Sequence, residues 1–175
     1  ADDNTAMGSN ALASNSTGAS NTAFGRAALD ANTTASYNTA MGHSALGANT
    51  TGASNTAVGY YALLTSTTAG ANTAVGSAAL KVLTTGSNNT AVGCAAGDSI
   101  TGGAQNTIVG MEALQANTTG GNNIAIGYQA LYANTASENV SIGTYSMDAN
   151  TTGGNNVAVG YNVLGANTTG SQNTA

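Results

Sequence analysis

The chain has 175 residues, of which 5% are charged, none is proline and 24 are glycine, and its formal net charge is −5. Only Arg26 and Lys81 are strong cations, which argues against a surface built for nucleic acid. No apolar run approaches the roughly 18 residues that span a bilayer, so we expect no membrane insertion in this segment, and a single cysteine, Cys94, excludes an internal disulfide.

A short unit recurs along the whole chain. The glycine that closes its Val-Ala-Val-Gly part is found ten times, and eight of the nine intervals between copies are 17 residues long. The exception is the 16-residue interval that ends at Gly143. These glycines are Gly8, Gly25, Gly42, Gly59, Gly76, Gly93, Gly110, Gly127, Gly143 and Gly160. A period this strict predicts a repeat architecture.

The first part of each unit alternates as a strand with one buried face does. In the copy at 123–127 the isoleucines Ile124 and Ile126 share a face, which we expect to point inward, and Ala125 lies on the other face. In the first seven copies Thr takes the first of these inward positions and Met, Phe or Val the second. Beta-branched residues at these positions favour a pleated, half-buried surface.

A second apolar piece, ending in Ala-Leu, follows the glycine and is itself followed by the turn residues Asn-Thr-Thr-Gly. About four residues between breakers are too few for a helix. We therefore predict two short strands and turns per unit, and a unit this small buries its apolar face only against its neighbours. The expected fold is all-β: a parallel β-solenoid of about ten 17-residue coils, with residues 1–175 forming one repeat domain. Because the last three residues begin another repeat, we expect a fragment of a longer fibre protein.

Stacked coils place like residues in columns about 4.8 Å apart. The Asn that opens each unit forms one such column, in which we expect the side-chain amides to hydrogen-bond as a ladder. The column of repeat glycines indicates positive φ or backbone too close for a Cβ. The predicted ladder includes Asn21, Asn38, Asn55, Asn72, Asn89, Asn106, Asn123 and Asn156.

Two hexapeptides, at 122–127 (Asn-Asn-Ile-Ala-Ile-Gly) and 155–160 (Asn-Asn-Val-Ala-Val-Gly), carry a family likeness. They resemble the Asn-Ser-Val-Ala-Ile-Gly signature of the heads of YadA-like trimeric autotransporter adhesins. The fuller unit is similar to arrays in phage-type tail-fibre proteins. The likeness covers essentially the whole chain and is specific as an array. The 17-residue period is longer than that of the adhesin heads, so head-specific binding surfaces are not carried over.

The resemblance implies a left-handed β-roll in which three chains pack side by side. We therefore expect an extracellular segment, on a cell surface or a virion fibre, that acts as rigid spacer and adhesion module of a homotrimer. Its partner would be an unidentified host-surface protein or glycan. Amphipathic tyrosines suit such a surface, although packing between chains explains them as well; the candidates are Tyr60, Tyr61, Tyr128, Tyr132 and Tyr161.

The central coils interrupt the pattern between Ser66 and Gly103. A second Asn column, present before and after this region, is replaced by Ser66, Leu83 and Ile100, and the usual Leu is replaced by Gly97. This irregularity is either a ligand-facing defect or a local compensation in which Ile100 fills the space of the missing Leu.

No catalytic or metal site is expected. Three copies of His43 around a three-fold axis could hold an ion, but no second ligand is spaced to help, and Cys94 has no basic neighbour in sequence. The sequence contains no acid pair, Ser-His-Asp set or phosphate loop, so we predict neither an enzyme nor a cofactor.

Two alternatives stay open. One is an ice-binding solenoid using the adjacent Thr pairs of the turns, such as Thr33 and Thr34, although neighbours in a strand point to opposite faces. The other is a purely structural surface filament with no ligand of its own.

Overall fold

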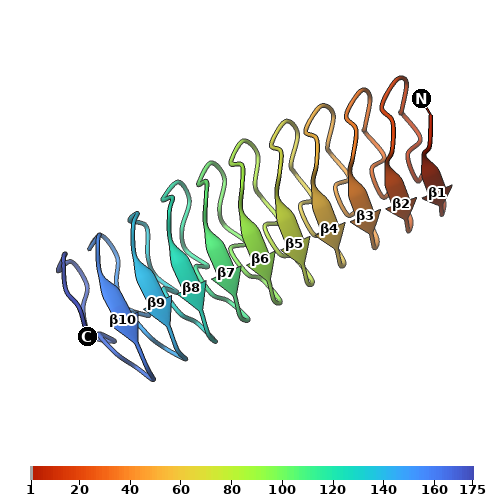
Figure 1. Ribbon diagram of the computed structural model, residues 1–175. Helices are drawn as coiled ribbons and strands as arrows, with labels where there is room; N and C mark the ends of the chain where they lie inside the picture. Colours follow the sequence, from red (N-terminus) through yellow and green to blue (C-terminus); the bar gives the residue numbers. More distant parts are fainter. Residues whose placement is uncertain (1) are drawn as a thin grey trace.

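A computed structural model describes residues 2–175 as one continuous rod of stacked coils (Figure 1). Ten strands of three residues each pair in parallel and in chain order, so each strand contacts only the one before and the one after it. The strands are β1 (Thr5–Met7), β2 (Thr22–Phe24), β3 (Thr39–Met41), β4 (Thr56–Val58), β5 (Thr73–Val75), β6 (Thr90–Val92), β7 (Thr107–Val109), β8 (Ile124–Ile126), β9 (Val140–Ile142) and β10 (Val157–Val159). The predicted parallel β-solenoid is confirmed.

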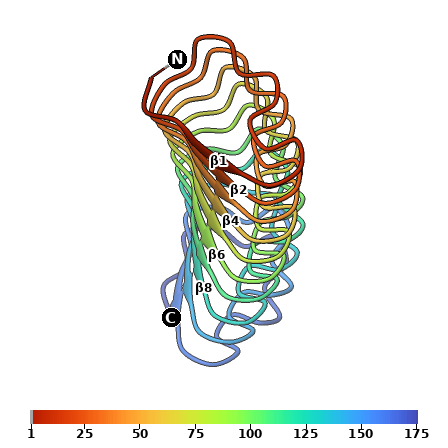
Figure 2. The same cartoon turned by 90° about the vertical axis from the view of Figure 1, so that its right-hand side faces the viewer.

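Each coil has one strand and not the two that we predicted. The Ala-Leu piece bends at every second residue, because Ala27 and Leu29 have φ of 53° and 51° and the same pattern returns in later coils. Left-handed residues cannot continue an extended strand. The bent segments still hydrogen-bond from coil to coil, as when Leu29 N–H donates to the Ala45 carbonyl at 3.1 Å. The strands therefore lie on one side of the rod and the loops on the other (Figure 2).

The face of the strands that points inward is the opposite of the one we predicted. The middle residue, usually Ala, is buried in nine of the ten strands, β1 being the exception, whereas the flanking residues are half-buried or exposed. Ala125 is fully buried, and Ile124 on the outer face is 36% exposed. The interior of a coil is too narrow for two bulky layers, and the Leu that follows the glycine already fills it.

Alanine and leucine columns make this narrow core. Leu29, Leu46, Leu63 and Leu80 are fully buried, and each holds a φ near 50°. A left-handed non-glycine residue costs roughly 1–2 kcal/mol, whereas burying a leucine side chain contributes roughly 1.5–3 kcal/mol. The burial term outweighs the backbone term, which is why leucine persists in this conformation.

The repeat glycines meet both conditions predicted from the sequence, a positive φ and backbone that lies too close for a Cβ. Gly25 has a φ of 134°, and a Cβ there would lie 2.6 Å from the Gly42 carbonyl oxygen of the next coil. The other repeat glycines have φ between 131° and 140°. Conformation and close backbone approach thus exclude any other residue from this column.

The Asn ladder is confirmed and does more than link amides. Asn38 Oδ1 accepts from the Asn55 backbone N–H at 2.9 Å, and Asn38 Nδ2 donates to the Gly52 carbonyl at 3.0 Å. From the second Asn column Asn49 Nδ2 donates to the same carbonyl at 3.0 Å. The two columns thus hold one loop carbonyl between them, and both the Asn38 amide and the Gly52 carbonyl are satisfied within the rod.

The central irregularity is compensated inside the core. A Cβ on Gly97 would lie 2.8 Å from Ile108 Cδ1 and 2.9 Å from Ile100 Cδ1, and both isoleucines are fully buried. Ile100 and Ile108 therefore occupy the volume of the missing leucine, as the compensation hypothesis expects for Ile100. The break leaves unsatisfied polar atoms in the second Asn column, because Asn49 Oδ1, Ser66 Oγ and Asn117 Oδ1 are buried without a hydrogen-bond partner.

Candidate binding surfaces

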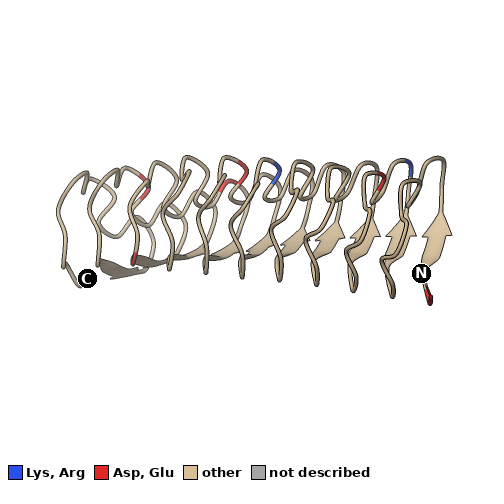
Figure 3. Cartoon of the chain, turned by 90° about the horizontal axis from the view of Figure 1, so that it is seen from above, with Lys and Arg blue, Asp and Glu red and all other residues tan. Residues whose placement is uncertain are grey.

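The outer face of the sheet is an uncharged stripe along the whole rod, which we call the strand face. It consists of the first and third residue of each strand. Figure 3 shows the charged residues in the connecting segments and none on a strand. The exposed apolar side chains of the strand face include Met7 (63% exposed), Phe24 (50%), Met41 (43%), Val92 (38%), Val109 (37%), Ile124 (36%), Ile142 (37%), Val157 (37%) and Val159 (57%).

The strand face is comparable in size with the largest surface patch of a typical monomer. Ten strands spaced about 4.8 Å apart, each three residues long, give a flat projection of about 480 Å². The largest apolar patch on a typical monomer is about 300–600 Å² and often marks an interaction site. This surface exists because the small Ala face points inward and leaves the bulky residues outside.

A second surface lies beside the strand face, at the residue that follows each repeat glycine. Three successive coils place Arg26, His43 and Tyr60 there, in one column. Arg26 Nη1 lies 3.3 Å from His43 Nε2, and the His43 ring stacks on the Tyr60 ring with centroids 5.5 Å apart at 27°. Tyr61 turns back toward both, with its centroid 3.8 Å from that of Tyr60 and 5.5 Å from that of His43. We call these four residues the Arg-His-Tyr cluster.

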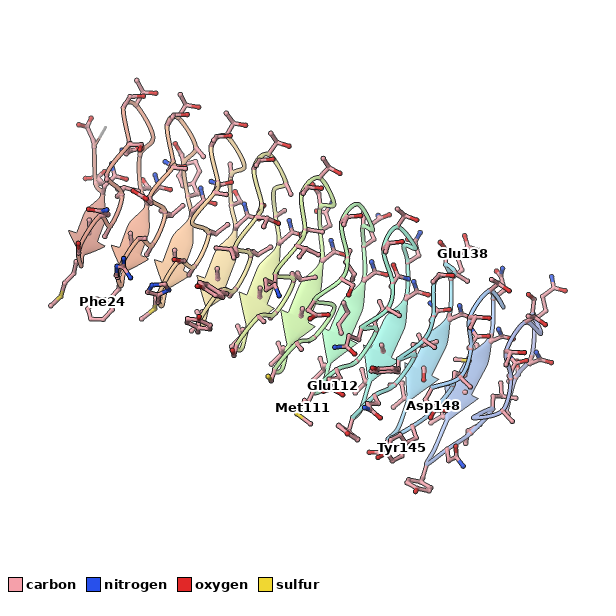
Figure 4. The ribbon with its side chains drawn as sticks, turned by 180° about the vertical axis from the view of Figure 1, so that it is seen from behind. Phe24, Met111, Glu112, Glu138, Tyr145 and Asp148 are labelled. Atoms are coloured by element: carbon pink, nitrogen blue, oxygen red, sulfur yellow. The ribbon has the colours of Figure 1, made fainter. Side chains whose placement is uncertain are left out.

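Another aromatic group lies further along the same edge. Tyr145 packs edge-on against Tyr128 at 5.3 Å and against Tyr161 at 6.2 Å. Burial and the neighbouring Tyr145 raise the pKa of Tyr128 above its ordinary value. Beside it, Gln129 donates to Glu112 Oε2 at 2.6 Å. Phe24, Met111 and Tyr145 project along one long edge of the rod, and Glu138 lies on the opposite edge (Figure 4).

The five tyrosines that we singled out therefore fall into three places. Tyr60 and Tyr61 belong to the Arg-His-Tyr cluster, Tyr128 and Tyr161 to the second aromatic group, and Tyr132 is 37% exposed in a different column. The grouping of Arg26 and His43 with the tyrosines was not predicted from the sequence. The 17-residue spacing of Arg26, His43 and Tyr60 is the signal that reveals it.

The remaining candidates give no enclosed site. Within residues 2–175 there is no pocket and no group of three side chains suited to a metal ion. Cys94 is an exposed free thiol. No helix in this described range is long and apolar enough to cross a bilayer.

The turn threonines are engaged in holding coils together. Thr33 Oγ1 donates to the Thr50 carbonyl at 3.1 Å, and Thr50 Oγ1 donates to the Thr67 carbonyl at 3.0 Å. Neighbours such as Thr34 are exposed in the turn and are not part of a flat strand. The Thr pairs of the turns therefore do not form the flat array that an ice-binding surface needs.

Comparison with known proteins adds no relative from which a family or a function could be transferred. No protein-family model, curated protein sequence or solved structure matches the chain.

Proposed function

We propose that this chain is a rigid segment of an extracellular homotrimeric fibre that serves as spacer and adhesion module. The observation that carries the proposal is the strand face, an uncharged stripe that runs through all ten strands. Its third strand position is apolar in every strand, and its first is Thr in seven strands and Ile or Val in three. Water-exposed apolar surface of this length favours association with a complementary surface. The loops on the other side of the rod and its edges then form the outside of the fibre.

The partner that fits the strand face best is another copy of the same chain. Every strand presents its two outward residues at the same spacing from the next strand, so a second rod in parallel matches it coil for coil. Homo-oligomers with closed symmetry are the commonest protein assemblies. The resemblance of the repeat to YadA-like heads and phage-type tail fibres implies three chains and a left-handed roll, on a cell surface or virion.

The assembly is tested by measuring the mass of the folded protein in solution. We expect sedimentation equilibrium to give three times the chain mass of 16.8 kDa. Replacing Val92, 38% exposed on β6, by Lys should yield a folded monomer, because it places a charge in the apolar interface. The matched control is Thr85→Lys, in an exposed loop position of the preceding coil, which should stay trimeric. A wild-type chain that is stable and monomeric would refute the trimer.

Ice binding is a second candidate, on a different set of threonines from those of the turns. The first strand position is Thr in seven consecutive strands, from Thr5 to Thr107, and all seven side chains lie on the strand face. Regular hydroxyls on a flat sheet are the feature that such a function needs. We place it second because Met7, Phe24 and Met41 interrupt the pattern with bulky side chains. Thermal hysteresis by a monomer at millimolar concentration would favour it over the fibre.

A further inference from the structure

The Arg-His-Tyr cluster is the one place in the described chain where a cation, a polar ring and exposed aromatic surface meet. Its members come from three adjacent coils, and the shared period of the repeat aligns them along one edge. The contacts run from Arg26 Nη1 to His43 Nε2 at 3.3 Å and from the His43 ring to the Tyr60 ring at 5.5 Å. The order along the rod is therefore guanidinium, imidazole, phenol.

The guanidinium of Arg26 is exposed, and no acidic side chain is among its hydrogen-bond partners in the described part of the chain. Arg26 is one of two strong cations in a chain with seven acidic residues. Its side-chain partner is a ring nitrogen of His43. A guanidinium carries five N–H donors in a fork that suits carboxylate and sulfate groups. Most of these donors are free to bind an anion.

The second ring nitrogen of His43, Nδ1, is a polar atom without a hydrogen-bond partner. When Arg26 donates to Nε2, the neutral ring carries its proton on Nδ1. That nitrogen is buried and has no hydrogen-bond partner. A buried polar atom without a partner is uncommon in folded proteins. The cluster thus holds an exposed guanidinium next to an unsatisfied polar atom.

Tyr60 supplies an apolar platform beside these polar groups. Tyr60 is 52% exposed, and its ring packs against those of His43 and Tyr61, which also contact each other. Aromatic rings present a large rigid contact surface at a low cost in conformational entropy. The C–H face of a sugar ring packs on such a surface, while a charged substituent on the sugar reaches toward the cation.

We infer that the Arg-His-Tyr cluster binds an acidic glycan, with the carboxylate or sulfate on Arg26, which His43 holds in place, and the sugar ring on Tyr60. This inference deepens the adhesive part of the proposed function by naming a ligand class. It does not depend on the number of chains in the fibre. The second aromatic group lacks a cation, with Glu112 near Tyr128, so it does not suit an anion.

The test compares three hexasaccharides of equal length by calorimetric titration into the full chain: an oligouronate, a sulfated oligosaccharide and a neutral one. We expect the uronate, the sulfated sugar or both to bind at least about tenfold more tightly than the neutral sugar. Loss of a charge-assisted hydrogen bond weakens binding by about 10- to 100-fold. Arg26→Gln should show a loss of this size, and Tyr60→Ala should also weaken binding. The two acidic arms decide between carboxylate and sulfate.

Two matched variants keep the test specific. Lys81→Gln removes the same net charge at the other strong cation, and Tyr37→Ala removes a tyrosine that is 69% exposed in another column; neither should change binding. Circular dichroism confirms that each variant is folded. The inference is overturned if no acidic sugar binds, if the neutral sugar binds equally well, or if Lys81→Gln loses as much as Arg26→Gln. The mass measurement is independent, so a trimer without sugar binding separates this failure from that of the fibre.

Discussion

The Asn ladder gives a prediction whose magnitude follows from hydrogen bonds in two coils. Asn72 Oδ1 accepts from the backbone N–H of Asn89 at 2.9 Å, and Asn72 Nδ2 donates to the Gly86 carbonyl at 3.0 Å. In this coil the second Asn column is replaced by Leu83, so no other amide reaches that carbonyl. Replacing Asn72 by Ala therefore leaves a buried N–H and a buried C=O without partners.

Asn38 is the matched position in a coil where both columns are intact. Its replacement by Ala orphans the Asn55 N–H, but the Gly52 carbonyl still accepts from Asn49 Nδ2 at 3.0 Å. Each buried polar group left unsatisfied costs roughly 1–3 kcal/mol. We expect a loss of about 2 kcal/mol for Asn38→Ala and about 4 kcal/mol for Asn72→Ala.

The assay is urea unfolding followed by circular dichroism, with the free energy of unfolding obtained by linear extrapolation. Equal slopes in the two variants would show that the same cooperative unit unfolds. Hydrogen exchange at the Asn55 and Asn89 amides adds a local readout, because each amide should lose protection only in the variant that removes its acceptor. Equal destabilisation of the two variants would refute the idea that the columns share the loop carbonyl.

Four further predictions concern two glycines and the tyrosines. Gly25→Ala should cost about 2–4 kcal/mol in the same unfolding assay, because φ is 134° and the new Cβ would meet a carbonyl of the next coil. Gly102→Ala should be close to neutral, since a Cβ there has only a side-chain oxygen at 3.6 Å as neighbour. Tyr61 raises the pKa of Tyr60, so Tyr61→Phe should reduce the most alkaline part of the phenol titration at 295 nm. A phenol whose pKa is raised by folding loses its stabilising contribution as pH rises through the folded pKa, so wild-type stability should fall above about pH 10.

The period of the repeat was enough to predict the architecture, the parallel stacking and the Asn ladder. Each of these follows from placing identical residues above one another, which requires only the spacing. The prediction of a second strand was wrong because the repeat leucines have φ near 50°. Leucine rarely adopts this conformation, so the residue type gives no sign of it. It is imposed by the closure of a 17-residue loop around a narrow core.

The inward face was predicted wrongly because strand alternation and the larger, mostly β-branched side chains were taken to mark the buried face. A better indicator of the inward position is a side chain whose size stays nearly constant from coil to coil. The middle strand residue is Ala in eight copies and Ser141 or Ile108 in the others, whereas the third residue varies among Met, Phe, Val and Ile. A core one residue thick tolerates little change in volume, and an open face tolerates much. The binding surfaces depend on this assignment, so the sequence alone did not locate the strand face.

The exception at Ile108 shows that the inner volume is shared between the middle strand residue and the leucine before it. Ile108 fits because Gly97, eleven residues earlier, has no side chain. The same pair can be moved to an ordinary coil, where Ala74 and Leu63 occupy these positions, both fully buried. Ala74→Ile alone should cost about 1–3 kcal/mol by overpacking, and Leu63→Gly alone about 2–5 kcal/mol by leaving a cavity.

Together the two changes should cost less than the sum of the single costs by at least about 1 kcal/mol, because residues that share one cavity do not act additively. The Gly substitution also relieves a φ of 51° at Leu63. The double variant further keeps the strand face unchanged, so its oligomeric state should equal that of the wild type. Additive costs in the double-mutant cycle would mean that the two positions do not share a volume. The inward placement of Ala would then no longer explain why the bulky residues of each strand are left outside.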